Sequence, residues 1–427
     1  MFKLLLATFM FSQLALAQTS PSNLQIEELD RKINILASEI EKLKIGNTVI
    51  KADQVMYGLG PAASKIYRVN EGLSIGGYGE IIYRNVSARN EKGDPSGMRD
   101  MADALRTVLY VGYKINDKFL VNTEIEFEHG GADSRSGNNA TGYVGAEFAY
   151  IDYLHTKEMN FRGGLVLIPM GFINEMHEPT VFLGVNRPDI ESKIIPTTWR
   201  ENGLGIWGDI GNFTYRTFVV NGFKGESFTA TGLRGGRQKG SEANAEDLAV
   251  VARADYQIIE GTVLGVAGYY GGSDQGVERN GVKPTNRTEI YDTHFEMKKA
   301  GFDLRFLGVV AYNSGAQELN AVATTPLTGN ATIGKRLIGA YLQLGYDVLR
   351  GKNQQQLIPF VRYSDYNTQD KVPNGFSANL ANEVKEYTIG VNYKPHQNIV
   401  VKFDYENENN KAQTGVNQYN LGLGFNF

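Results

Sequence analysis

The chain has 427 residues, of which 42% are hydrophobic, 47 are Asp or Glu and 43 are Lys or Arg, so its formal net charge is −4. Beyond the N-terminus, no continuous apolar run approaches the roughly 18 to 20 residues that a membrane-spanning helix needs, which excludes a helical membrane protein. The acidic balance argues against nucleic acid as a partner. Because the sequence contains no cysteine, the fold cannot depend on disulfides and needs a large core or a closed sheet.

The first 72 residues predict an export signal, a helix and a linker. Residues 1–17 have a basic Lys3, an apolar run and a small-x-small ending, typical of a secretory signal peptide. In residues 22–45, apolar side chains recur as in a coiled coil with Ile at a and Leu at d, namely Ile26, Leu29, Ile33, Leu36, Ile40 and Leu43. That pattern alone favours two helices, whereas the barrel predicted below leads us to expect three. A single amphipathic helix is the alternative, and residues 46–72 have no clear period and are expected to be a linker.

Residues 73–427 predict a transmembrane antiparallel β-barrel, so the fold class is all-β with a short N-terminal α-helical coiled coil. The 49 Gly, 23 Tyr and 21 Phe suit closely packed barrel strands with aromatic belts. Apolar and polar side chains alternate in about sixteen segments. These lie near 73–86, 103–114, 119–129, 144–156, 159–169, 201–210, 213–221, 247–259, 262–272, 289–300, 301–312, 335–348, 356–366, 384–394, 398–406 and 417–427.

The last segment shows the alternation without exception. One parity is fully apolar, with Tyr419, Leu421, Leu423, Phe425 and Phe427, and the other is polar or glycine. An apolar face with aromatics at both ends favours a strand that faces lipid. An edge strand of a soluble sandwich is the alternative.

Short connections rich in Gly, Asn, Asp and Pro alternate with long polar ones, as in a barrel with tight turns at one end. We expect the short turns at the periplasmic end and the long loops outside the cell. Such a barrel would be embedded in the lipid of a bacterial outer membrane.

The parity opposite the apolar one should face the lumen. It carries charges of both signs, which indicates a wet interior, because a charge facing lipid at mid-depth costs roughly 2–4 kcal/mol. We expect these lumen residues to include Arg84, Arg106, Glu124, Glu126, Arg216, Arg253, Arg305 and Arg362. An interior filled by a salt-bridge network is the alternative.

The longest connection, residues 169–200, is unusually apolar for a loop in solvent. We hypothesise that it folds into the barrel and constricts it. Its candidate eyelet charges are Glu175, Glu178, Arg187, Asp189, Glu191, Lys193 and Arg200. A loop packed at a subunit interface is the alternative.

A basic cluster, Arg234, Arg237 and Lys239, lies in the long loop 222–246 and could attract anions to the mouth. A solvated loop tip is the alternative. The five His are scattered without ligand spacing, so no metal site or other cofactor is expected. No catalytic ordering of Ser, His and Asp stands out, so an enzyme is not expected, and a barrel hydrolase is the enzymatic alternative.

Several short runs resemble the phosphate-selective porin O/P group. They are residues 73–80, the Gly-Leu-x-x-Pro-x-Gly run at 164–171, residues 186–188 with 199–203, and residues 232–239. The resemblance covers about 70–427 and implies a sixteen-stranded trimeric channel with anion selectivity. Members of that group carry a ladder of lumen Arg and a Lys-rich eyelet, whereas the lumen residues here are mixed in charge.

Together these patterns predict an outer-membrane porin through which small hydrophilic solutes diffuse, with anions such as phosphate as one solute class, assembled as a homotrimer with a periplasmic coiled coil. The alternative function is a plugged barrel that acts as a structural or surface-recognition protein.

Overall fold

The computed structural model describes residues 31, 32, 34, 56–131, 142–352 and 354–427. The chain divides into two compact units, Met1–Val49 and Ile50–Phe427. The predicted signal peptide lies outside the described residues. Of the predicted coiled coil only three residues are described, and all three are helical.

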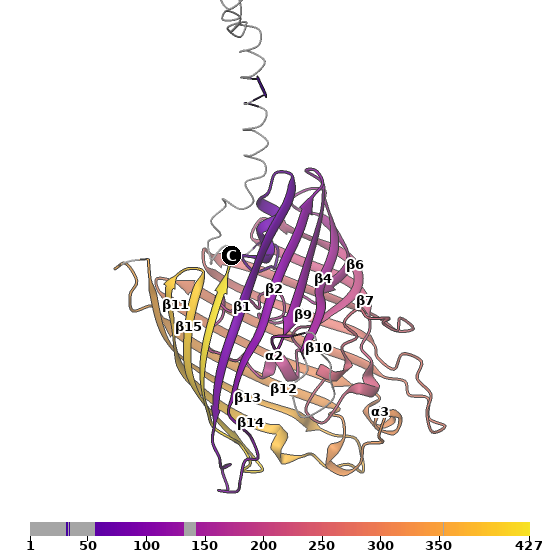
Figure 1. Ribbon diagram of the computed structural model, residues 1–427. Helices are drawn as coiled ribbons and strands as arrows, with labels where there is room; N and C mark the ends of the chain where they lie inside the picture. Colours follow the sequence, from indigo (N-terminus) through magenta and orange to yellow (C-terminus); the bar gives the residue numbers. More distant parts are fainter. Residues whose placement is uncertain (1–30, 33, 35–55, 132–141, 353) are drawn as a thin grey trace, which may run out of the picture. The chain divides into compact units, whose positions relative to one another are not determined.

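The second unit is a closed barrel of sixteen antiparallel strands, each paired with its neighbours in sequence, and β1 closes on β16 (Figure 1). The strands are β1 (Gly72–Val86), β2 (Met101–Lys114), β3 (Phe119–Glu128), β4 (Tyr143–Leu154), β5 (Asn160–Leu167), β6 (Arg200–Ile210), β7 (Phe213–Asn221), β8 (Leu248–Ile259), β9 (Thr262–Gly272), β10 (Arg287–Lys299), β11 (Phe302–Asn313), β12 (Arg336–Tyr346), β13 (Gln356–Lys371), β14 (Glu383–His396), β15 (Ile399–Asn410) and β16 (Gln418–Asn426). Each predicted segment coincides with one strand, so the predicted fold class and strand number are confirmed.

Short helices lie in the connections. They are η1 (Ala63–Arg68), α2 (Ile190–Lys193), η2 (Gly225–Ser227), η3 (Arg234–Gly236), α3 (Ala316–Val322), η4 (Gly329–Ala331) and η5 (Leu380–Asn382). Within the described ranges, none of the helices combines the length and apolar character needed to cross a membrane.

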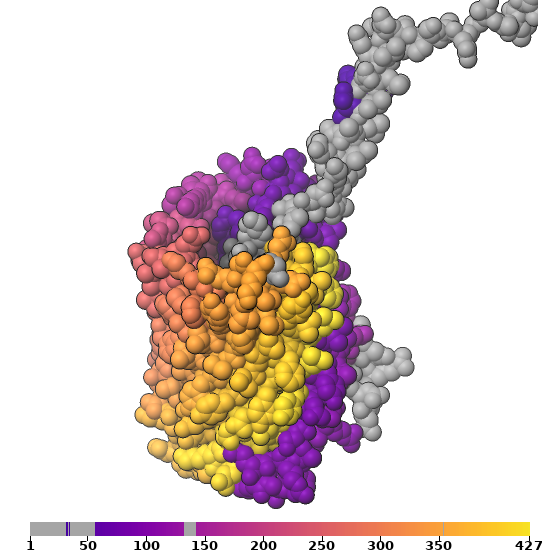
Figure 2. Space-filling view, turned by 90° about the vertical axis from the view of Figure 1, so that its left-hand side faces the viewer, coloured from indigo at the N-terminus to yellow at the C-terminus, as the bar shows by residue number. Residues whose placement is uncertain are grey.

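The outer face of the barrel is apolar. In β16, Leu421, Leu423 and Phe425 are exposed while the residues between them are buried, as the alternation predicted. Exposed aromatic side chains pair across strands near both ends, such as Phe302 with Tyr346 near the short turns and Tyr363 with Tyr387 toward the long loops. The tilted strands of the C-terminal half, orange to yellow in Figure 2, form a continuous outer wall. Apolar side chains between two aromatic belts are typical of a barrel that faces lipid.

Tight turns connect neighbouring strands at one end of the barrel. Between β8 and β9, Gly261 has φ +76°, and between β10 and β11, Gly301 has φ +88°. A side chain at such a φ is disfavoured, which is why glycine occupies these turns.

Residues 56–71, which fall within the predicted linker, instead pack against the inner wall, and we call them the pre-barrel segment. Leu59 and Ile66 are only 1% exposed. At Gly112 on the inner face of β2, an added Cβ would lie 2.8 Å from the nearest Ile66 side-chain atom. The missing side chain at Gly112 allows that close approach, and a single glycine on a strand gives no periodic signal.

Gly77 lies at the seam where β1 closes on β16, and the fold should be sensitive to its substitution. A Cβ at Gly77 would lie 2.3 Å from the Val108 carbonyl oxygen and 2.7 Å from the Phe427 ring. We therefore expect Gly77→Ala to lower the free energy of unfolding by about 1–3 kcal/mol, the usual cost of overpacking. Urea unfolding in detergent measures this, with Gly268→Ala as the control because its nearest contact would be an ordinary 3.4 Å. Equal stability of the two variants would contradict the tight seam.

Candidate functional site inside the barrel

The connection between β5 and β6, residues 168–199, lies inside the barrel, and we call it the inner loop. Its backbone bonds to inward side chains on well-separated strands of the wall: the Gly171 amide donates to Asp292 of β10 at 3.1 Å, and the Val185 amide donates to Asp404 of β15 at 2.6 Å. The predicted folding of this loop into the lumen is confirmed. Its contacts reach from wall to wall.

Cationic side chains of the wall hold the backbone of the inner loop. They donate to its carbonyl oxygens in five pairs: Arg253 with Gly171, Arg305 with Val181 (2.7 Å), Arg362 with Leu183 (3.5 Å), Lys394 with Thr180 (2.8 Å) and Lys402 with Gly184 (2.7 Å). A buried carbonyl without a donor is costly, so these wall residues supply what a loop inside a protein requires.

A carboxylate within the inner loop fixes its turn. Glu191 accepts hydrogen bonds from the Phe172 and Ile173 amides, both at 2.7 Å, and from the Tyr341 hydroxyl of β12 at 2.6 Å. Burial raises the pKa of Glu191, although these three donors oppose the shift. The two ends of the loop are therefore tied together and to the wall.

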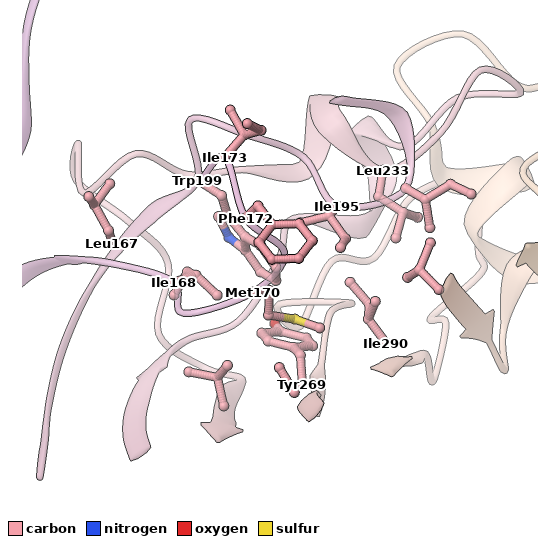
Figure 3. Close-up of a cluster of buried hydrophobic side chains, with 14 of the residues drawn as sticks. Leu167, Ile168, Met170, Phe172, Ile173, Ile195, Trp199, Leu233, Tyr269 and Ile290 are labelled. Carbon is pink, nitrogen blue, oxygen red and sulfur yellow. The ribbon is translucent and has the colours of Figure 1, made fainter. Parts of the chain in front are cut away.

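Apolar side chains fill the space on one side of the inner loop (Figure 3). The Trp199 ring stacks on Phe223 with ring centres 4.4 Å apart, and Tyr269 lies 5.0 Å from Trp199. Met170 and Phe172 belong to the same buried cluster. The apolar composition that marked this loop in the sequence is explained by this core.

A histidine of the inner loop contacts the barrel wall at β3. His177 lies 3.1 Å from Glu124 of β3 and is 2% exposed. Burial alone would lower the pKa of His177, but the Glu124 carboxylate outweighs it and the pKa rises to about 9. The imidazole is thus cationic at neutral pH and pairs with Glu124.

Glu178 joins three parts of the chain. It accepts from the backbone amides of Ala62 (2.9 Å) and Ala63 (3.2 Å) in the pre-barrel segment and from the Asn426 side chain of β16 (2.9 Å). Burial raises the pKa of Glu178 to about 7, against the effect of these donors. The carboxyl is therefore a shared acceptor for the pre-barrel segment and the last strand.

Of the six arginines predicted to line the lumen, all but Arg84 face inward and lie against carboxylates. The shortest distances are Arg106 to Glu80 3.4 Å, Arg216 to Asp255 2.7 Å, Arg253 to Asp255 2.8 Å, Arg305 to Glu296 2.7 Å and Arg362 to Glu386 3.7 Å. None of these arginines is more than 8% exposed. At this depth the wall charges are neutralised and covered.

The remaining candidate charges of the lumen and the inner loop differ in their partners and burial. Arg84 of β1 donates to Asn186 at 3.0 Å. Arg187, the next residue after Asn186, is half-buried. Lys193 pairs with Asp189 at 2.7 Å. Arg200 forms a buried ion pair with Glu147 of β4.

The basic cluster lies where the 222–246 loop meets the inner loop. Arg237 donates to the Thr197 and Thr198 carbonyls at 2.9 and 2.8 Å, and Arg234 is exposed. Partial burial lowers the pKa of Arg237 to about 10, and nearby Arg200 acts in the same direction. Lys239 lies over the Tyr143 ring.

The sequence did not indicate three contributors to the site: the pre-barrel segment, Tyr341 and Asn426. The last two lie on the inward parity of their strands, so the alternation marks where they point without naming their partners. Within the described ranges, no three His, Asp or Glu side chains come together in a way that could hold a metal ion.

Comparison with known proteins identifies a relative. No family model matches the chain. An uncharacterized protein of Aquifex aeolicus (strain VF5) is 36% identical over 393 residues, covering 90% of this chain and 87% of the relative. The chain belongs to the family of that protein.

Solved structures with the same fold include a porin and an outer membrane protein. OmpF of Salmonella typhi, in complex with daunomycin, is 15% identical with a TM-score of 0.53 over 85% of this chain and 99% of that one. An anion-selective porin from Comamonas acidovorans is 12% identical with a TM-score of 0.53 over 84% and 100%. OmpT, an outer membrane protein of Vibrio cholerae in a trimer form, is 11% identical with a TM-score of 0.50 over 83% and 99%. At these identities the likeness shows a porin-like fold, and the O/P resemblance stays a prediction.

The His177 pair predicts a pH-dependent loosening of the inner loop. A group whose folded pKa is raised stabilises the fold below its unfolded pKa, about 6.5, and that stability is lost as the pH rises through the folded pKa. Above a pH of about 9, Glu124 therefore loses its cationic partner. We expect the hydrogen-exchange protection of inner-loop amides, corrected for intrinsic exchange, to fall as the pH passes about 9.

His177→Gln is the matched control. It can keep a hydrogen bond to Glu124 but carries no charge, so it should be less protected at neutral pH and show no step near pH 9. A wild-type loop with constant protection through this range would contradict the pairing.

Proposed function

We propose that this protein is a bacterial outer-membrane channel of the porin type, held closed in this conformation by its inner loop. The observation that carries the proposal is a porin-like barrel whose charged inner wall is bonded to a loop that crosses the lumen. The barrel supplies a polar conduit, and the loop determines whether solute can use it.

Outer-membrane placement is supported by the apolar outer face between two aromatic belts. The structures that share the fold are named as outer-membrane proteins or porins. In this orientation the short turns would face the periplasm and the long loops the exterior. A homotrimer with a periplasmic coiled coil is part of the proposal, supported by the trimer form of OmpT and by the Ile and Leu pattern of residues 22–45.

A transport role explains the charged inner wall better than a purely structural one, because a structural barrel could use an apolar filling with less desolvation cost. We propose a channel for small hydrophilic solutes. We propose no enzymatic activity, because no catalytic ordering of Ser, His and Asp stands out in the sequence.

A permanently plugged barrel with a structural or recognition role is the second candidate. The specific observation in its favour is the wall-to-wall bonding of the inner loop, in which five wall cations bind loop carbonyls. The two candidates differ in whether current flows once the loop is removed.

Selectivity for anions such as phosphate is the finer proposal, and the basic cluster supports it. The inward arginines have neutralising partners, whereas Arg237 binds backbone carbonyls and Arg234 is exposed. A positive field at the mouth would raise the local concentration of anions.

Deleting residues 175–192 is expected to open the lumen. The deletion removes the carbonyls that cover Arg305, Arg362 and Lys402 and leaves the barrel strands intact. In planar bilayers we expect low or absent current for the full-length protein and a steady ohmic current, several-fold larger, for the variant.

Deletion within the external loop 273–286, which joins β9 to β10, is a control for effects of shortening the chain. Folding of the 175–192 deletion variant is verified by heat-modifiable migration on gels. If the folded variant carries no current, the channel is contradicted and the plugged barrel is favoured.

Replacing Arg234, Arg237 and Lys239 together by Gln tests the anion preference. In a salt gradient, the loop-deleted channel should have a reversal potential of anion-selective sign, and the triple replacement should move it toward zero or to the opposite sign. Arg336→Gln is the control because Arg336 is neutralised by Asp370, so its replacement should leave the reversal potential unchanged. If the triple variant has the same reversal potential as the unsubstituted channel, the basic cluster does not determine ion selectivity.

A further inference from the structure

The inward face of β3 is polar from Glu128 to Asn122. From the long-loop end toward the short turns it carries Glu128, Glu126, Glu124 and Asn122, which we call the β3 track. At its outer end, Arg234 of the basic cluster is influenced by the charge of Glu128. The track thus leads inward from the basic cluster.

Several buried atoms along the β3 track lack a hydrogen-bond partner in the described part of the chain. They are both carboxylate oxygens of Glu126, one oxygen of Glu124 and the hydroxyl of Tyr78, which is fully buried. Buried polar groups of native proteins are satisfied by protein or by water. Water along the inward face of β3 would satisfy these atoms.

The β3 track ends at the pre-barrel segment. Asn122, its last member, donates to the Ala63 carbonyl at 3.0 Å. Leu59, Ala62 and Ile66 are buried there and belong to one apolar cluster. An apolar layer thus closes the polar track at its inner end.

The pre-barrel segment is not held to the barrel by backbone pairing, as the barrel strands are held to one another. Over residues 56–69, the backbone hydrogen bonds in the described structure are local, such as Ser64 to Gly60 and Val69 to Ile66. It has no strand pairing with the barrel. It can therefore separate from the wall without breaking the sheet.

Side chains supply its attachments. Glu178 accepts from Ala62 and Ala63, and Tyr67 donates to Asp152 at 2.6 Å. Arg162 donates to the Tyr67 hydroxyl at 2.7 Å. The attachment to Glu178 comes from the inner loop itself, so the loop and the pre-barrel segment are mechanically coupled.

We propose that the pre-barrel segment is a gate that closes the inner end of a permeation route along the β3 track, and that Glu178 is its latch. The gate rests on the proposed channel function. Release of the latch, by movement of the inner loop or of the segment, opens the route to the periplasmic end. Gate and inner loop then act in series on the same path.

A reversible crosslink tests the gate. The protein has no cysteine, and a Cβ at Gly112 would lie 3.0 Å from the Ile66 Cβ, so Ile66→Cys with Gly112→Cys can form a disulfide after a small adjustment. The pair is introduced into the 175–192 deletion, which lacks Glu178. Mass spectrometry establishes the extent of crosslinking, and each single cysteine variant is a control.

We expect current through the deleted channel to fall several-fold on oxidation and to return on reduction. Current that is the same in the oxidised and reduced forms would overturn the gate while the channel function stands. A deletion variant that is silent even when reduced and without the cysteines would overturn the proposed function itself.

Glu178→Ala in the full-length protein provides a second measurement if the deletion does not fold. Loss of the latch should raise the frequency of open events, and the oxidised cysteine pair should abolish that rise. Opening at the wild-type frequency, or opening that persists when the pair is oxidised, would overturn the gate.

Discussion

The backbone of the inner loop depends on donors from the barrel wall. A loop threaded through a lumen carries amides and carbonyls that are costly to bury without partners. Arg305 and Lys402 each donate to a loop carbonyl, and Asp404 accepts from a loop amide. Wall and loop therefore specify one another, because removal of either leaves buried charges or buried backbone groups unsatisfied.

This dependence changes the meaning of the inward arginines. The O/P resemblance implies a ladder of lumen arginines that attracts anions, but in the structure Arg253 and Arg362 each bind both a carboxylate and a loop carbonyl. Their charge is used for attachment. In the proposed channel, selectivity would therefore depend on the basic cluster and closure on the inner loop.

The sequence predicted the barrel well because a strand that separates lipid from polar groups must alternate at every residue. β16 shows this fully, and the apolar character of the inner loop predicted its position inside. The ion pairs could not be predicted, because the pairing of Arg216 with Asp255 depends on the register between β7 and β8. The packing of Ile66 against Gly112 was also beyond prediction, since a short 3-10 helix has too few residues to show a period.

The inner loop fills the middle of the lumen, and the accessibility of a cysteine there to a bulky thiol reagent tests this filling most directly. Thr388 of β14 faces inward, is 2% exposed and lies beside Arg362. Thr388→Cys is expected to resist an aqueous maleimide in the folded protein, whereas Ser377→Cys, which lies exposed in an external loop, should react quickly. Rapid labelling of Thr388→Cys in the folded, full-length protein would contradict a closed lumen.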